Sequence, residues 1–104
     1  MKEILKVSKN EHYIAMSNFH LKDPRLSIQA KGLLTLLLSM PDDWEYSTDA
    51  LKSMMREDEF AIQRIINELT AAGYFRTEVI RDLKGIPYRT EYFVFEKSQT
   101  GKTA

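Results

Sequence analysis

Hydrophobic residues recur at helical spacing between Glu59 and Ala72. Asp58 stands where it can cap the first turn of such a helix, and Gly73 stands where it can end the last turn. A shorter helix is expected in front of it, from Ser47 to Met54. The stretch therefore predicts two helices joined by a tight turn. The buried face of the second helix is expected to consist of Ile62, Ile65, Ile66 and Leu69.

The opposite face of the second helix carries one aromatic and three long polar side chains, Phe60, Gln63, Arg64 and Asn67. With a short helix in front, this arrangement is what a helix-turn-helix uses to contact base edges in the DNA major groove. The same pattern also fits an ordinary solvated face, because most surface helices are polar outside.

The continuation of the chain favours the DNA-binding interpretation. Tyr74 to Arg81 and Tyr88 to Glu96 are rich in aromatic and β-branched residues, and Asp82 to Gly85 between them is typical of a turn. Two helices followed by a β-hairpin is the order of a winged helix. The contacts to DNA phosphates would then come from the start of the first of these helices and from the hairpin, through Ser47, Thr48, Arg81, Lys84 and Arg89.

A further helix is expected from Ser27 to about Met40, where Pro41 ends it. Its leucines leave it apolar on almost every side, which predicts burial all round, within the domain or partly against a second copy. Gly32 is expected to permit a close helix contact. Trp44, the only tryptophan, is expected to pack at the corner between the two helices that follow.

These elements together predict an α+β fold. It is a winged helix-turn-helix of three helices with a C-terminal β-hairpin wing and a short N-terminal strand at Tyr13 to Ser17. Residues 1–12 are expected to form a flexible N-terminus, residues 13–96 the winged-helix DNA-binding domain, and residues 97–104 a disordered tail.

Composition narrows the class of protein. A chain of 104 residues forms one domain, and the absence of cysteine excludes disulfides and thiolate metal sites. We expect a cytoplasmic protein with no membrane role, because no apolar stretch is long enough to span a bilayer. His12 and His20 lack a third nitrogen or sulfur ligand, and no carboxylate pair lies in an apolar setting. We therefore expect no enzyme, metal or cofactor.

The net charge of the chain is zero, with fifteen basic and fifteen acidic residues. DNA affinity depends largely on cations that replace counterions at phosphates, so neutrality counts against strong binding by one copy. Glu57, Asp58 and Glu59 before the second helix suit its dipole but would repel a phosphate. We expect a homodimer reading two half-sites, joined through the leucine-rich helix or the strand Tyr92 to Phe95.

Three segments together resemble a known family: Leu26 to Met54, Ala61 to Phe75, and the turn Arg81 to Gly85. The chain is similar there to the N-terminal winged-helix domain of phage and plasmid replication proteins of low-GC Gram-positive bacteria, the replisome-organiser and DnaD-like group. The resemblance covers about Tyr13 to Glu96. It implies binding of double-stranded DNA at an origin and recruitment of other replication proteins.

The sequence departs from that family at the turn before the second helix, where members often carry a glycine and basic residues and this chain has carboxylates. We expect a DNA-binding domain of a replication initiation or organiser protein of a phage, plasmid or mobile element. A winged-helix transcription regulator is the nearest alternative. A protein-protein assembly module without direct DNA contact is the alternative from another class.

Overall fold

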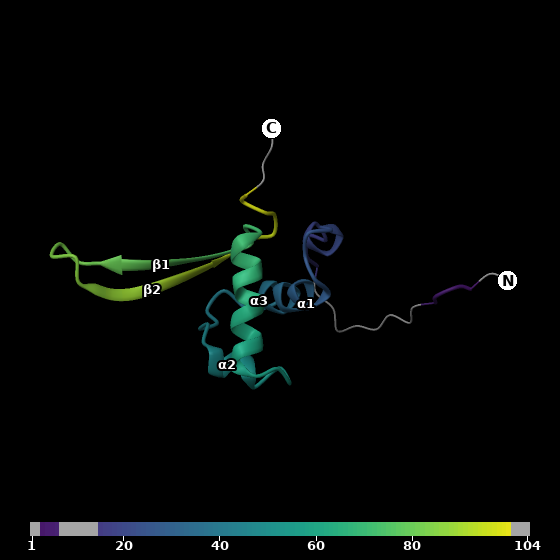
Figure 1. Ribbon diagram of the computed structural model, residues 1–104, viewed down its shortest axis with the longest axis horizontal. Coiled ribbons are helices and arrows are strands. Elements are labelled where there is room, and N and C mark those ends of the chain that lie inside the picture. Colours follow the sequence, from purple (N-terminus) through teal and green to yellow (C-terminus); the bar gives the residue numbers. More distant parts are fainter. Residues whose placement is uncertain (1–2, 7–14, 101–104) are drawn as a thin grey trace.

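The computed structural model describes residues 3–6 and 15–100, and Figure 1 shows the arrangement of its elements. Within these residues the fold is α+β, with three α-helices, a short 3-10 helix and a two-stranded antiparallel sheet. The expected order of three helices followed by a hairpin is confirmed. The elements are η1 (His20–Lys22), α1 (Ile28–Leu38), α2 (Thr48–Lys52), α3 (Glu59–Ala71), β1 (Phe75–Arg81) and β2 (Pro87–Val94).

Each α-helix begins at a side chain that accepts a hydrogen bond from the first turn. Ser27 accepts from the Ala30 N–H before α1, and Asp58 accepts from the Ala61 N–H before α3, so both predicted caps are confirmed. At the end of α3, Gly73 adopts the left-handed conformation with φ of 85°. A side chain at Gly73 would also collide with the backbone nitrogen of Thr100, 2.5 Å from the position of a Cβ atom.

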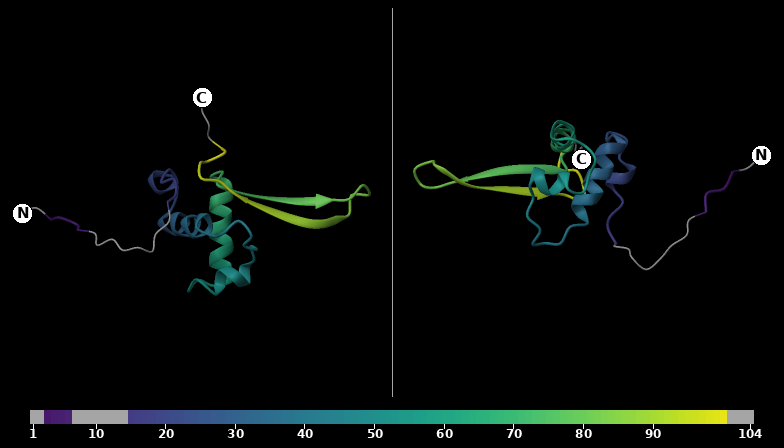
Figure 2. Two further views of the ribbon diagram at one scale, coloured as in Figure 1. Left: turned by 180° about the vertical axis from the view of Figure 1, so that it is seen from behind. Right: turned by 90° about the horizontal axis from the view of Figure 1, so that it is seen from below.

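The core lies between α1, α2, α3 and the start of the hairpin, and Figure 2 shows α1 and α3 packed against each other. All four residues predicted for the inner face of α3 are buried. Burial of these apolar side chains at about 25 cal/mol per Å2 holds the helices together. The buried residues of the helices are Ala30, Leu33, Leu34, Leu37, Leu51, Ile62, Ile65, Ile66 and Leu69.

Within one copy of the chain, the leucine-rich helix is not buried on every side, so of the two expected alternatives burial wholly within the domain is wrong. Ile28 is 82% exposed, and a Cβ atom at Gly32 would meet no described atom within 4 Å, so Gly32 makes no close helix contact within the described chain. The helix also ends at Leu38 rather than Met40. The reason is geometric, because the rest of this small domain covers only one side of α1. The helix expected from Ser47 to Met54 is also shorter, because α2 ends at Lys52; beyond its end Met55 packs on the core and Met54 is exposed.

The hairpin projects away from the helices as a narrow arm (Figure 1). Its strands pair in antiparallel register from Phe75 opposite Val94 to Arg81 opposite Pro87, with an irregularity between Ile80 and Arg81. The strands are slightly shorter than expected, starting at Phe75 and ending at Val94.

Aromatic rings join the linker before α2 to the base of this arm. Trp44 meets Tyr46 edge to face with ring centroids 6.3 Å apart, and Tyr46 lies 4.4 Å from Tyr92 and 5.6 Å from Phe75. The expected packing role of Trp44 is confirmed, since it is half-buried against the core. Its aromatic partner is Tyr46, whose own ring contacts aromatic rings of the hairpin.

The ends of the chain differ in part from the expectation. Residues 15–17 form no strand, so the N-terminal strand is wrong there, and Tyr13 and Ile14 lie outside the described residues. Of the expected N-terminus 1–12, only residues 3–6 are described, without helix or strand. In the expected tail, Ser98 and Gln99 are anchored, because they donate hydrogen bonds to the Ala72 and Gly73 carbonyls at 2.5 and 2.8 Å. Residues 101–104 lie outside the described part.

Candidate nucleic-acid interface

The outer face of α3 presents the four side chains that the sequence predicts for base contacts. Gln63, Arg64 and Asn67 are exposed along it, and Phe60 near its start is 88% exposed. In Figure 1 α3 lies in front of α1, which places this helix at the surface of the domain. The structure therefore brings these residues together on one accessible face.

Hydrogen bonds hold the polar side chains of this face in place. The Gln63 Nε2 donates to Oδ1 of Asn67 at 2.9 Å, one helical turn away. In this arrangement the Gln63 side chain turns an acceptor outward and the Asn67 side chain turns a donor outward. An acceptor and a donor side by side match the N6 and N7 edge of adenine. Arg64 donates from Nη1 to Oε1 of Gln29 on α1, at a longer 3.4 Å.

Two hydrogen bonds fix α3 against the start of α1. Glu68 accepts from the backbone N–H of Ser27 at 2.7 Å and from its hydroxyl at 2.8 Å. The same serine hydroxyl accepts from Ala30 N–H, so one residue both starts α1 and holds α3. The sequence predicts Ser27 as a cap but carries no signal for its contact with Glu68, which is 41 residues away.

A buried polar group beyond this same C-terminal end of α3 was not anticipated. Asp23 is buried and accepts hydrogen bonds from the Tyr74 hydroxyl at 2.6 Å and from the Arg25 guanidinium at 2.8 Å. The Arg25 hydrogen bond holds the pKa of Asp23 well below its usual range. Burial and the hydrogen bond to Asp23 raise the pKa of Tyr74 to about 12. In the sequence the Asp23-Pro24 pair is typical of a turn, and nothing local indicates the contact with Tyr74.

His20 on η1 is also buried, and its Nε2 lies 2.8 Å from the Thr35 hydroxyl of α1. Its Nδ1 has no hydrogen-bond partner among the described residues. Burial lowers the pKa of His20, and the nearby Lys31 lowers it further. The described residues contain no group of three histidine, aspartate or glutamate side chains that could hold a metal ion.

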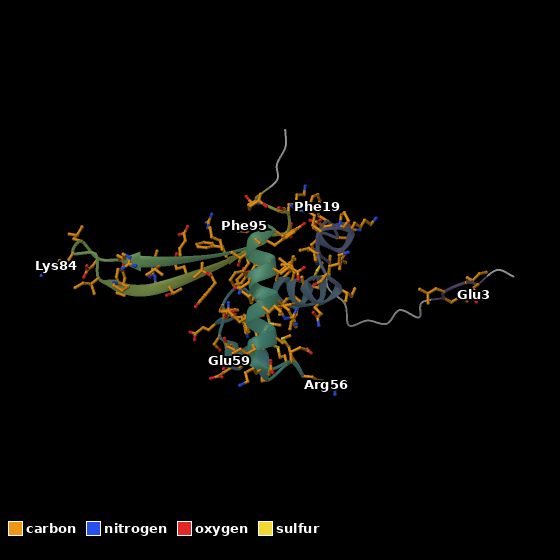
Figure 3. The ribbon with its side chains drawn as sticks, in the orientation of Figure 1. Glu3, Phe19, Arg56, Glu59, Lys84 and Phe95 are labelled. Carbon is orange, nitrogen blue, oxygen red and sulfur yellow. The ribbon has the colours of Figure 1, made fainter. Side chains whose placement is uncertain are left out.

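The hairpin carries the predicted phosphate-binding cations away from the helices. Arg81 donates from Nη1 to the Gly85 carbonyl at 3.1 Å, and Arg89 pairs with Glu91 at 2.9 Å. Lys84 lies at the far end of the arm (Figure 3). Exposed ion pairs of this kind contribute about 0 to 1 kcal/mol, so a phosphate can compete for Arg89.

The start of α2 offers less to a phosphate than the sequence suggests. The Ser47 hydroxyl accepts from the Ala50 N–H at 3.0 Å, and Thr48 is half-buried. Both residues lie in the helical body, whereas Lys84 lies at the arm's tip, far from the helices (Figure 3). The structure thus divides the predicted site into two parts, the α3 face and the arm.

The turn before α3 is acidic, as its sequence indicates. Asp58 is committed to the cap, with its Oδ1 accepting from Ala61 N–H at 2.9 Å, while Glu57 is half-buried and Glu59 is exposed. Figure 3 shows Glu59 and Arg56 at this end of α3, on opposite sides of the helix in this view. A DNA duplex lying on α3 would therefore be repelled at the helix start unless it approaches closer to Asn67.

No helix of the described residues is long and apolar enough to cross a membrane. No protein-family model matches the sequence, and neither the curated proteins nor the solved structures contain a match.

Proposed function

We propose that this chain is a winged-helix DNA-binding domain that binds double-stranded DNA. The observation that carries the proposal is the α3 face, where Gln63, Arg64 and Asn67 stand exposed on a helix anchored to α1. The resemblance to replication proteins supports the further proposal that the domain belongs to a replication initiation or organiser protein of a phage, plasmid or mobile element, with other replication proteins as partners.

In this proposal α3 enters the major groove. The outward acceptor of Gln63 and donor of Asn67 contact an adenine, and the Arg64 guanidinium turns from Gln29 to a guanine. Replacing the Gln29 contact of Arg64 by a contact to guanine is favourable, because the hydrogen bond to Gln29 is long at 3.4 Å and therefore weak. Arg81, Lys84 and Arg89 on the arm contact phosphates, which fixes the register of α3 without reading sequence.

Affinity of a single copy is expected to be modest. The chain is neutral, so few phosphates are neutralised, and non-specific binding at physiological salt falls toward the weak end of roughly 10^-4 to 10^-6 M. Two copies on half-sites about 34 Å apart would double the contacts. We therefore propose that a homodimer is the DNA-binding form.

A protein-protein assembly module is the second candidate, and a specific observation favours it. Phe60 is 88% exposed at the start of α3, beside Glu57 and Glu59. An exposed aromatic ring among carboxylates is suited to a basic protein surface rather than to DNA. A winged-helix transcription regulator differs from the proposal only in what the bound DNA controls.

Selection of bound duplexes from a random library tests the proposal. We expect the whole chain to enrich one sequence motif containing adenine and guanine, and the Gln63→Ala variant to relax selection at the adenine. Lys52→Ala, an exposed cation on α2, serves as the matched control and leaves the motif unchanged. Absence of enrichment, together with no binding of any duplex at low salt, would overturn DNA binding and leave the assembly module.

A further inference from the structure

The most exposed apolar side chain of the described residues lies at the tip of the arm. Leu83 has an exposed fraction of 107%, and Ile86 beside it is 55% exposed. Neither side chain belongs to the hydrophobic core. Since a leucine gains stability only when it leaves water, Leu83 contributes little to this fold, and with Ile86 it leaves a small apolar surface open to a contact outside the domain.

The turn holds Leu83 in a defined position. The Asp82 carbonyl accepts from the Gly85 N–H and the Asp82 N–H donates to the Ile86 carbonyl, both at 2.9 Å. The Asp82 carboxylate accepts from the N–H groups of Lys84 and Ile86, again at 2.9 Å. Gly85 has φ of 81°, which closes the turn. Leu83 therefore stands at the corner of a tight, hydrogen-bonded turn.

The charges around this apolar tip are mostly positive. Arg81 and Lys84 flank it, Arg89 lies next along the arm in an exposed ion pair with Glu91, and the one carboxylate between Val79 and Thr90 is Asp82. Because Asp82 is satisfied by two backbone N–H groups, its negative charge is partly neutralised. An apolar corner flanked by cations matches a groove whose walls are phosphates and whose floor is stacked bases.

We propose that the tip of the arm enters the DNA minor groove and that Leu83 inserts between stacked base pairs, a proposal that rests on the DNA-binding function above. The minor groove is about 6 Å wide, and paired strands stand about 4.8 Å apart before side chains are added. The ribbon is therefore too wide to enter an unwidened groove, and only the side chains at its corner can do so. Apolar wedges of this kind unstack a base step and bend the duplex by roughly 20 to 90°.

The arm gives this contact its reach. Its strands of seven and eight residues extend about 25 Å, and the tip lies beyond the helical body in Figure 1. DNA held on α3 would have to curve toward the body for the tip to touch it. If Leu83 bends the duplex, one duplex can contact both the α3 face and the tip of the arm.

The test uses the whole chain and an A·T-rich duplex of about 30 base pairs, with 2-aminopurine at its central TA steps and a dye at each end. We expect the parent to raise the 2-aminopurine fluorescence and to shorten the distance between the ends. Leu83→Ser is expected to lose both signals while its affinity falls less than tenfold. Val79→Ser on the shaft, where Val79 is 47% exposed, is the matched control and retains both signals.

The other outcomes separate this inference from the proposed function. A parent that binds the duplex without bending or unstacking it, or a Leu83→Ser variant that bends it equally, overturns the wedge and leaves DNA binding intact. Failure of the parent to bind any duplex overturns both. If Leu83→Ser instead converts a free dimer to a monomer in sedimentation, the tip is a protein contact and the wedge is wrong.

Discussion

Tyr74 donates a hydrogen bond of 2.6 Å to Asp23, although the two residues are 51 positions apart in the chain. Tyr74 follows the glycine that ends α3 and is completely buried, while Asp23 lies in the loop before α1. The contact joins the loop before α1 to the point where α3 passes into the arm. It thereby fixes the direction in which the arm leaves the domain.

Tyr74→Phe is expected to lower the free energy of unfolding by about 1 to 3 kcal/mol, because it removes a donor from a buried carboxylate and leaves the packing unchanged. Urea denaturation measures the change. Tyr88→Phe is the matched control, since Tyr88 is 63% exposed on the arm. Equal midpoints for the two variants would show that the Asp23 hydrogen bond contributes nothing to stability.

His20 should make stability depend on pH below about 6.5, its ordinary pKa. Burial lowers the pKa of His20 in the folded protein, so below this pH the unfolded chain binds more protons and the free energy of unfolding falls as the pH falls. His20→Gln should flatten this part of the profile, and His12→Gln should not. Parallel profiles for the parent and His20→Gln between pH 7 and 5 would contradict the argument.

Leu69→Ala is expected to cost about 2 to 5 kcal/mol, because Leu69 is fully buried in the core on α3 and its truncation leaves a cavity. Leu83→Ala removes the same atoms from a fully exposed position and should change the free energy of unfolding by less than about 0.5 kcal/mol. Urea melts of the pair report both values. A large loss for Leu83→Ala would mean that the tip packs on something within the protein.

Arg64→Ala should weaken binding to the selected duplex by about 1 to 3 kcal/mol and leave binding to a scrambled duplex unchanged, because it removes a base contact. Lys84→Ala should weaken both duplexes alike and reduce the salt slope by about one, because it removes a phosphate contact. Fluorescence anisotropy over a salt series separates the two behaviours. Parent-like binding by both variants would place the DNA elsewhere on the domain.

The chain should form a two-fold dimer at micromolar concentration through the outward side of α1. Ile28, Gly32 and Leu36 lie four residues apart on that helix, where Ile28 is exposed and Leu36 is half-buried. Ile28→Asp should therefore give a monomer in sedimentation velocity, and Lys52→Asp should not. If the parent sediments as a monomer of about 12 kDa, this interface is ruled out. The DNA itself would then have to bring two copies together on two half-sites.

The sequence by itself determined the elements whose signals are local. The spacing of Ile62, Ile65, Ile66 and Leu69, the cap at Asp58 and the stop at Gly73 specify α3 within one residue, because periodicity and capping involve neighbours along the chain. The turn from Asp82 to Gly85 is equally local and places the hairpin correctly. The exposed face of α3 follows from its buried face.

Only the tertiary structure decided which surfaces remain open. A run of leucines fits a helix buried on all sides as well as one buried on a single side, and the size of the rest of the domain leaves Ile28 in water. The contacts of Asp23 with Tyr74 and of Ser27 with Glu68 join positions 51 and 41 residues apart, so no local pattern contains them. The arm's departure from the helices, which carries Lys84 away from α3, is likewise set by packing at its base, where Tyr46 meets Phe75 and Tyr92.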